Sequence, residues 1–380
     1  MRTTMPRTRS RDDKKSPALP GQVVLVLQGG GALGAYQLGC YQALHEAGIE
    51  PDWVIGTSIG AINAALIAGN PPERRLQALH TFWQHMQRAV PDGPALAPLA
   101  WFGQPNLAAN LATVWRGIPD FFTPNLHAWR GQTAALGVES AAWYSTAPLR
   151  ETLLELVDFE YLCDCRTRMT VGAVNVVSGA MRYFDTRRER LGVEHVMASG
   201  ALPPAFGAVR IDGEPYWDGG IYSNTPIEAV LDDKPRRDSL IFAVNVWHQQ
   251  GPEPESIWQV MGRQKDIQYA SRADSHIARQ KQIHRLRHVI RELCAALPEN
   301  KRKDPKVQEL AGWGCGTTMH VAHLIAPRLD GEDHTKDIDF TPHGVRSRRE
   351  AGYADTCRMI ERAPWAHAAA DPIEGVIEHL

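Results

Sequence analysis

A serine between two glycines is the residue of this chain best placed to carry out chemistry. Residues 52–66 read as a short apolar strand, a Gly56-x-Ser58-x-Gly60 turn and a helix of small residues. A serine at such a turn has an exposed hydroxyl and a strained backbone that only small neighbours tolerate. The start of the following helix also favours negative charge that develops beside the serine. The pattern alone arises by chance in many chains, but with this strand and helix around it we expect Ser58 to be a nucleophile, with Gly56 and Gly60 leaving room for the turn.

A glycine-rich turn precedes the serine and offers main-chain donors. The apolar run at 23–27 predicts a strand buried on both faces, and it leads into Gly29, Gly30 and Gly31 and then into a helix. Adjacent parallel strands would bring this turn beside Ser58, where its N–H groups can bind an oxyanion. With Gly34, the same glycines satisfy the G-x-G-x-x-G pattern of dinucleotide-binding proteins.

The dinucleotide alternative has a specific requirement in the second strand. It needs an acidic residue for the ribose hydroxyls at the far end of that strand. The two acidic candidates, Glu50 and Asp52, precede the strand, and its far end holds Gly56, Thr57 and Ser58. The serine interpretation is therefore favoured over the cofactor interpretation.

A carboxylate followed by two glycines lies 160 positions further along the chain. Asp212-Gly213 predicts a hairpin turn, and Asp218 with Gly219 and Gly220 comes directly after the second strand of that hairpin. The paired glycines would let the Asp218 carboxylate approach another stretch of backbone closely. Asp218 could instead be a simple Asx-turn residue.

The totals place these candidates in an ordinary globular chain. Its 380 residues, 43% of them hydrophobic and 22% charged, suit one large α/β domain with an extension, and a net charge of -2 gives no attraction towards nucleic acid. We expect the six cysteines to be reduced thiols of a cytoplasmic protein, and their spacing predicts no zinc site. The six cysteines are Cys40, Cys163, Cys165, Cys294, Cys315 and Cys357. No segment is apolar enough to cross a membrane.

Three segments flank or interrupt the expected domain at 21–250. Residues 1–20 read as a disordered basic leader. Residues 91–143 form either an irregular insertion with its own small core or a pocket wall that takes acyl chains. Aromatic side chains mark this insertion: Trp101, Phe102, Trp115, Phe121, Phe122, Trp129 and Trp143.

The last third of the chain, residues 251–380, is expected to be a mostly helical extension without an assigned role. A long helical pattern covers 256–297 and is rich in arginine and lysine. It fits either a solvated helix packed on the domain or a basic surface for anionic lipid headgroups, which would give peripheral membrane contact. His320-x-x-His323 with Cys315 nearby is too sparse to predict a metal site.

Taken together, the motifs resemble those of the patatin-like phospholipase family, of the bacterial type with a C-terminal extension. The matching residues run in order over about 20–250: the Gly29–Gly34 turn, the Gly56–Gly60 turn, the 198–203 run Ala-Ser-Gly-Ala-Leu-Pro, and Asp218-Gly219-Gly220 followed by Asn224-x-Pro226. The chain departs from many family members at Leu33, where they carry Arg or Lys.

The resemblance implies a three-layer α/β/α fold and hydrolysis of lipid or other acyl esters by a Ser58–Asp218 dyad without cofactor or metal. It also implies an oxyanion hole at Gly29–Gly31. Because an ordinary aspartate has a pKa near 4, Asp218 would need a low-dielectric site to act as the base. A Ser-His-Asp triad is the rival mechanism, with His195 the histidine nearest in sequence to Asp218. A low-activity lipid-binding or regulatory module with the same fold is the alternative function.

Overall fold

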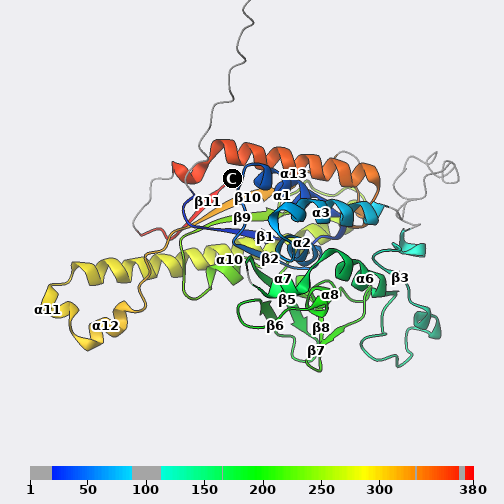
Figure 1. Cartoon of the computed structure of the whole chain (residues 1–380), viewed down its shortest axis with the longest axis horizontal. Helices are drawn as coiled ribbons and strands as arrows, with labels where there is room; N and C mark the ends of the chain where they lie inside the picture. The colour runs from blue at the N-terminus through cyan, green and yellow to red at the C-terminus, as the bar shows by residue number, and fades with distance from the viewer. Residues whose placement is uncertain (1–18, 88–112, 165, 330–331, 368–372) are drawn as a thin grey trace, which may run out of the picture.

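Nine strands form one mixed sheet around which the chain is arranged (Figure 1). The computed structural model describes residues 19–87, 113–164, 166–329, 332–367 and 373–380. The expected leader at 1–20 therefore lies almost entirely outside the described residues, and Trp101 and Phe102 lie wholly outside them. The strand order is β11-β10-β9-β1-β2-β5-β8-β7, with β6 on the other edge of β5. The strands are β1 (Gln22–Leu27), β2 (Trp53–Gly56), β5 (Arg168–Asn175), β6 (Met181–Asp185), β7 (Val209–Ile211), β8 (Glu214–Asp218), β9 (Ser239–Asn245), β10 (Met319–Ile325) and β11 (Val376–His379).

The sheet is parallel from β11 to β5 and antiparallel beyond it. A short separate ribbon pairs β3 (Thr123–Pro124) with β4 (Tyr144–Ser145). The parallel half consists of strands whose connections cross over through helices, so its inner strands β2, β5 and β9 are buried almost throughout. Every residue of β1 after Gln22 is buried, as the continuous apolar run predicted.

Helices cover both faces of the sheet, which confirms the predicted three-layer α/β class. The helices are α1 (Ala35–Glu46), α2 (Ile59–Ala68), α3 (Pro72–Gln87), α6 (Ala147–Leu156), α7 (Phe159–Cys163), α8 (Val193–Ser199), α9 (Glu228–Leu231), α10 (Ile257–Ala296), α11 (Glu299–Arg302), α12 (Pro305–Ala311) and α13 (Pro342–Arg362). Short 3-10 turns occur at η1 (Gly31–Gly34), η3 (Leu126–Arg130), η4 (Gly219–Ile221), η5 (Lys336–Ile338) and η6 (Pro364–Ala366).

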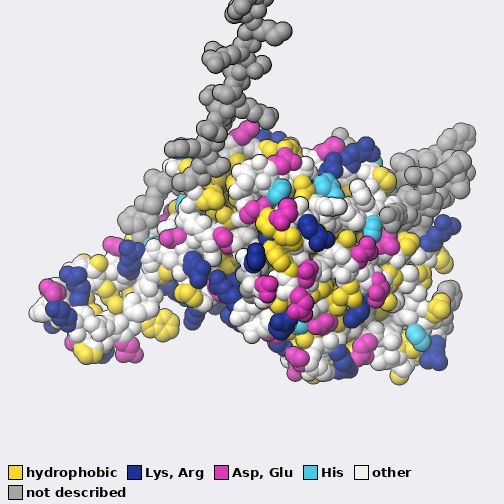
Figure 2. Space-filling model, viewed as in Figure 1, with side chains coloured by type: hydrophobic (Ala, Val, Ile, Leu, Met, Phe, Trp, Pro, Cys, Tyr) yellow, Lys and Arg dark blue, Asp and Glu magenta, His cyan; other side chains and the backbone are white. Residues whose placement is uncertain are grey.

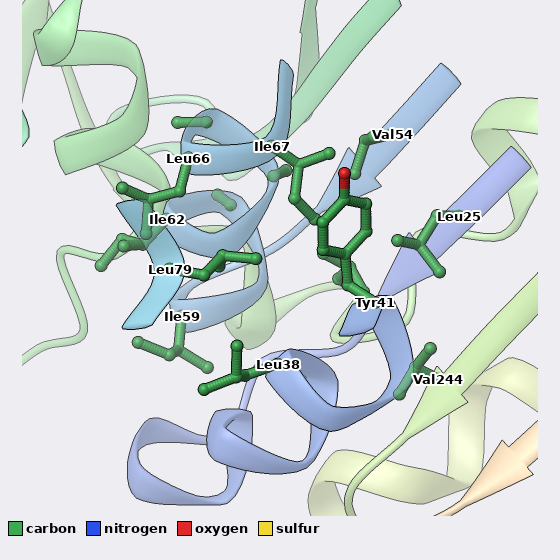
Figure 3. Packing of buried hydrophobic residues seen from close by; sticks show 14 of the residues in the cluster. Leu25, Leu38, Tyr41, Val54, Ile59, Ile62, Leu66, Ile67, Leu79 and Val244 are labelled. Carbon is green, nitrogen blue, oxygen red and sulfur yellow. The ribbon is translucent and has the colours of Figure 1, made fainter. Parts of the chain in front are cut away.

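The two faces of β1 show how the layers divide. Leu25 points into the larger core with Leu38 and Tyr41 of α1 and Ile62 of α2 (Figure 3). Val24 and Val26 point the opposite way into a smaller core. That second core is closed by Val230 and Leu231 of α9 and Ile277 of α10. Period-two alternation on a doubly covered strand accounts for this division.

The C-terminal third contributes to the same sheet. β10 lies between β9 and β11, so residues after 250 supply two parallel strands as well as the long helix that the sequence predicted. Helix α13 packs so closely on α1 that their backbones touch, because a Cβ on Gly39 of α1 would lie 1.9 Å from the carbonyl oxygen of Arg349 in α13. The last third is therefore continuous with the sheet domain in its packing, and the sequence pattern alone did not reveal these strands.

Candidate active site

Ser58 sits at a strained turn between β2 and α2. Its φ of 57° and ψ of -128° lie in a region that non-glycine residues rarely occupy. The turn is pressed against the end of β1, because a Cβ on Gly60 would lie 2.2 Å from the carbonyl oxygen of Leu27. A Cβ on Gly56 would in turn lie 2.2 Å from the carbonyl oxygen of Gly60. The structure thus holds the serine in a geometry that requires small neighbours.

Ser199, at the end of α8, fixes the backbone of this turn. The N–H of Ser58 donates to the carbonyl oxygen of Ser199 at 3.1 Å and lies 3.2 Å from its Oγ. The Ser199 hydroxyl itself donates to the carbonyl oxygen of Gly172 in β5 at 2.7 Å. Ser199 is completely buried, so these bonds are shielded from water. The sequence marked Ser199 only as part of a motif and gave no sign of this role.

Strand pairing brings Asp218 to the serine. Thr170 and Val171 of β5 pair with both β2 and β6, while Ala173 and Val174 pair with both β6 and β8. Strands β2 and β8 therefore share one edge of β5 and run toward each other along it. Gly56 lies opposite Val171 and Asp218 lies opposite Ala173. The ends of the two strands meet there, which places the carboxylate beside the turn that carries Ser58.

The Asp218 carboxyl is fully buried, and its two oxygens differ. Oδ1 accepts a hydrogen bond of 2.7 Å from the N–H of Gly220, whereas Oδ2 is buried and has no hydrogen-bond partner within the described part of the chain. Burial raises the pKa of Asp218 to about 7, because a low-dielectric site disfavours the charged form. Interaction with the Ser58 hydroxyl and the bond from Gly220 lower the pKa and so oppose part of this effect. A carboxylate with this pKa has the proton affinity of a general base at neutral pH.

The glycine-rich turn lies against the same serine. A Cβ on Gly29 would come within 3.0 Å of the Ser58 Cβ, and Gly31 has a φ of +55° with the backbone of Asp337 packed directly against it. The N–H of Gly29 donates to the carbonyl oxygen of Asn224 at 3.1 Å. Within the described part of the chain, the N–H groups of Gly30 and Gly31 have no acceptor. Two of the three predicted donors are therefore available to a ligand and one is occupied.

Side chains from distant segments hold the glycine-rich turn in place. The carbonyl oxygen of Gly29 accepts from the Asn224 amide at 2.9 Å and from the Trp247 indole at 2.8 Å. Gln28 donates to Thr225 and accepts from the backbone N–H of Trp247. The Tyr269 carbonyl in α10 accepts from both Gln28 and Asn224. Sequence reasoning missed Gln28, Trp247 and Tyr269, since no motif includes them.

A cavity of about 190 Å³ opens onto Ser58 and Asp218. One wall is a cluster of aromatic rings in mutual contact, formed by Phe121, Phe122, Tyr144 and Phe206. The first two belong to the described part of the 91–143 segment. Trp115 and Trp143 of that segment are exposed instead. The C-terminal third adds Tyr269, Asp337, Ile338 and Phe340 to the lining.

The rival interpretations find less support in the geometry. His195 is buried on α8, where its Nδ1 accepts from the N–H of Gly192 and its ring packs on Phe184. No histidine is found among the described residues that line the cavity. Glu50 pairs with Arg75, and Asp52 accepts from the Val23 N–H at the opposite end of β2 from Ser58. Leu33 is buried and does not line the cavity.

No described helix combines the length and apolar character needed to cross a bilayer. Figure 2 shows positive and negative side chains interspersed over one face, with hydrophobic side chains between them.

Comparisons with known proteins give a consistent result. A family model described as a patatin-like phospholipase matches residues 25–231, and a second, described as a patatin phospholipase, matches residues 267–371. The chain is 29% identical over 245 residues to lysophospholipase NTE1 of Candida glabrata, covering 63% of this chain and 12% of that protein. It is 28% identical over 232 residues to lysophospholipase NTE1 of Saccharomyces cerevisiae, covering 60% of this chain and 11% of that protein.

The chain thus spans about one-tenth of the length of these curated relatives. Among solved structures, VipD from Legionella pneumophila aligns with a TM-score of 0.38 at 15% identity, over 91% of this chain and 67% of that one.

Proposed function

Because the chain belongs to the patatin-like phospholipase family, we propose that it is a serine hydrolase that cleaves carboxylic esters of lipids. The observation that carries this proposal is the buried Asp218, with a pKa raised to about 7, beside the strained Ser58 in an apolar cavity. A serine hydroxyl is a weak nucleophile until a base takes its proton, and Asp218 has both the position and the proton affinity to do so.

In the first half of the proposed reaction, ionised Asp218 takes the proton of the Ser58 hydroxyl as Oγ attacks the ester carbonyl carbon. The carbonyl oxygen becomes an oxyanion, and the free N–H groups of Gly30 and Gly31 are the donors proposed to stabilise it. The tetrahedral intermediate then expels the alcohol, which receives the proton from Asp218. An acyl group remains on Ser58.

In the second half, a water molecule replaces the departed alcohol. Asp218 accepts a proton from this water as its oxygen attacks the acyl carbon, and the same two N–H groups would stabilise the second oxyanion. Collapse of that intermediate returns the proton to Ser58 Oγ and releases a fatty acid. The aromatic wall at Phe121, Phe122 and Phe206 would hold the acyl chain by apolar contact.

The names of the curated relatives suggest lysophospholipids as the first substrates to test. A lysophosphatidylcholine carries one acyl chain, which the apolar cavity at Ser58 could accept. A panel that also contains diacyl phospholipids, monoacylglycerol and short aryl esters would separate headgroup preference from chain preference.

Labelling with a fluorophosphonate probe tests the proposed nucleophile directly. We expect wild-type protein to be labelled at Ser58 and to hydrolyse lysophosphatidylcholine, and Ser58→Ala to lose both labelling and at least about a thousandfold of the activity. Ser178→Ala, at an exposed turn serine, is the matched control and should behave as wild type. Labelling at another serine, or activity retained by Ser58→Ala, would refute the mechanism. Lipid binding without labelling would favour a non-catalytic lipid-binding module.

A further inference from the structure

A second group of chemically reactive side chains lies at the base of the helical arm. The far half of α10, together with α11 and α12, extends away from the sheet before the chain returns to β10 (Figure 1). Where it returns, Cys315 meets His284 and His288 of α10. One potential ligand atom from each of the three lies within 4.8 Å of the other two. In the described part of the chain, this is the one group of three such side chains that converges in this way.

The two histidines are arranged in the way that is usual for metal ligands. They are one helical turn apart, so they occupy the same face of α10. His284 Nε2 lies 3.3 Å from the carbonyl oxygen of Leu231, and His288 Nε2 lies 2.9 Å from that of Thr317. A carbonyl oxygen only accepts, so Nε2 carries the hydrogen in both rings and Nδ1 keeps the lone pair. Fixing one ring nitrogen on a carbonyl while the other binds the metal is the usual outer-shell arrangement.

An unsatisfied atom points to a missing partner. His284 is completely buried, and its Nδ1 has no hydrogen-bond partner among the residues that the structure describes. A buried lone pair without a donor is unfavourable by about 1–3 kcal/mol, so such atoms are uncommon in folded proteins. A metal ion at the centre of the cluster would satisfy this nitrogen.

Cys315 supplies the third atom from the returning segment. It is a free thiol, and its backbone N–H donates to the carbonyl oxygen of Arg287 at 3.3 Å, which ties the segment to α10. Its Sγ lies 3.0 Å from the Thr317 hydroxyl. The site therefore joins α10, on which the chain enters the arm, to the segment at Cys315, on which it leaves the arm 27 residues after His288.

We propose that His284, His288 and Cys315 form a binding site for a zinc-type divalent cation, with a water molecule as the fourth ligand. Zinc bonds of about 2.0–2.3 Å in tetrahedral geometry place ligand atoms roughly 3.4–3.7 Å apart. The potential ligand atoms lie within 4.8 Å of one another, so side-chain movements of about 1 Å would bring them to this spacing. Binding replaces the thiol hydrogen by the metal and releases one proton to solvent. The site stabilises the base of the arm and is separate from the cavity at Ser58.

The surrounding charge determines how strongly the site depends on its cysteine. Arg236 and Arg287 both act electrostatically on His284, and Arg287 also interacts with Cys315. These positive charges oppose a bare dication, and the negative charge of a metal-bound thiolate at Cys315 offsets them. Loss of the thiol should therefore weaken binding more than loss of either imidazole.

Titration of the purified full-length chain with Zn²⁺ alone, after treatment with a chelator, tests the proposal. We expect one equivalent bound with release of a proton, and a thiolate-to-metal absorption band when Co²⁺ replaces Zn²⁺. Cys315→Ser should abolish the band, and His284→Gln or His288→Gln should weaken binding at least about tenfold. Cys294→Ser, which removes another thiol of α10, and His343→Gln, at an exposed histidine, are matched controls that should bind as wild type.

A measurement on the wild-type chain keeps the test independent of whether the variants fold. Zn²⁺ should slow alkylation of Cys315 at least about tenfold, as followed by peptide mass, and leave the rate at Cys294 unchanged. The absence of stoichiometric binding, equal loss in Cys315→Ser and Cys294→Ser, or equal alkylation of Cys315 with and without Zn²⁺ would overturn the proposal.

Discussion

Replacing Asp218 by asparagine should abolish ester cleavage while stabilising the fold above neutral pH. The wild-type carboxyl is fully buried and no described residue hydrogen-bonds to its Oδ2, so its ionised form is costly in the folded state. Its pKa rises from 3.8 to about 7 on folding. At about 1.4 kcal/mol per pH unit, ionising it at pH 8 opposes folding by about 4 kcal/mol. Asparagine has nearly the same shape and no charge, so it removes this cost together with the proposed base.

The raised pKa fixes the direction in which the free energy of unfolding changes with pH. Because the folded pKa is the higher one, the stabilising effect of the proton is fully present below about pH 4 and is lost as the pH rises through about 7. The gain in free energy of unfolding on Asp218→Asn should therefore grow by about 2–3 kcal/mol between pH 5 and pH 8. Any constant difference in hydrogen bonding by the asparagine amide cancels from this comparison.

Urea unfolding of both proteins at pH 5 and pH 8 measures this difference. Asp212→Asn, at an exposed carboxylate in the β7–β8 turn, is the matched control and should show no pH-dependent gain. In parallel, wild-type kcat/KM should fall about tenfold per unit as the pH drops below about 7, because the base must be ionised. A gain in the free energy of unfolding on Asp218→Asn that is independent of pH, or one that shrinks toward pH 8, would refute the burial of an ionisable carboxyl at this position.

Four further substitutions probe the turn, the donors and the cavity. Ser58→Gly should be inactive yet about 1–3 kcal/mol more stable to urea than Ser58→Ala, because glycine accepts the backbone conformation that strains an L residue. Gly31→Ala should lower the free energy of unfolding by more than about 2 kcal/mol and reduce kcat. Gly48 is also at positive φ but has open space around it, so Gly48→Ala should lower the free energy of unfolding by only about 1 kcal/mol in the same assay. Ser199→Ala should lower kcat by about tenfold with little change in KM, and an unchanged kcat would exclude its positioning role. Phe206→Ala should reduce kcat/KM for long-chain esters more than for short ones, which a chain-length series measures.

Local sequence patterns were sufficient wherever the structure depends on near neighbours. The apolar run at 23–27 became the buried β1, and the Asp212-Gly213 pair became the tight turn between β7 and β8. The Gly56–Gly60 stretch became the strained turn at Ser58 for the same reason, since both its glycines and its flanking elements lie within a few residues. The family resemblance stated from these motifs is confirmed by the family model over 25–231.

Long-range packing accounts for what the sequence left unassigned. Strand β11 has only four residues and includes Glu378 and His379, and β10 carries His320 and His323, so the apolar pattern of both is interrupted. Pairing with β9 places β10 in the sheet, and β11 pairs with β10. Tyr269 and Phe340 line the cavity although no motif surrounds either of them. The cluster at Cys315 arises because α10 leaves the sheet and the chain returns beside it, which no residue spacing indicates.

The sequence by itself determined the β-α-β-α start of the chain and the candidate nucleophile, because periodicity and glycine placement act over a few residues. Only the tertiary structure decided what Asp218 can do. Its burial and the shared edge of β5 that brings it to Ser58 result from contacts between segments 160 positions apart. A carboxylate acquires the proton affinity of a base from the medium that surrounds it, and that medium exists only once the chain has folded.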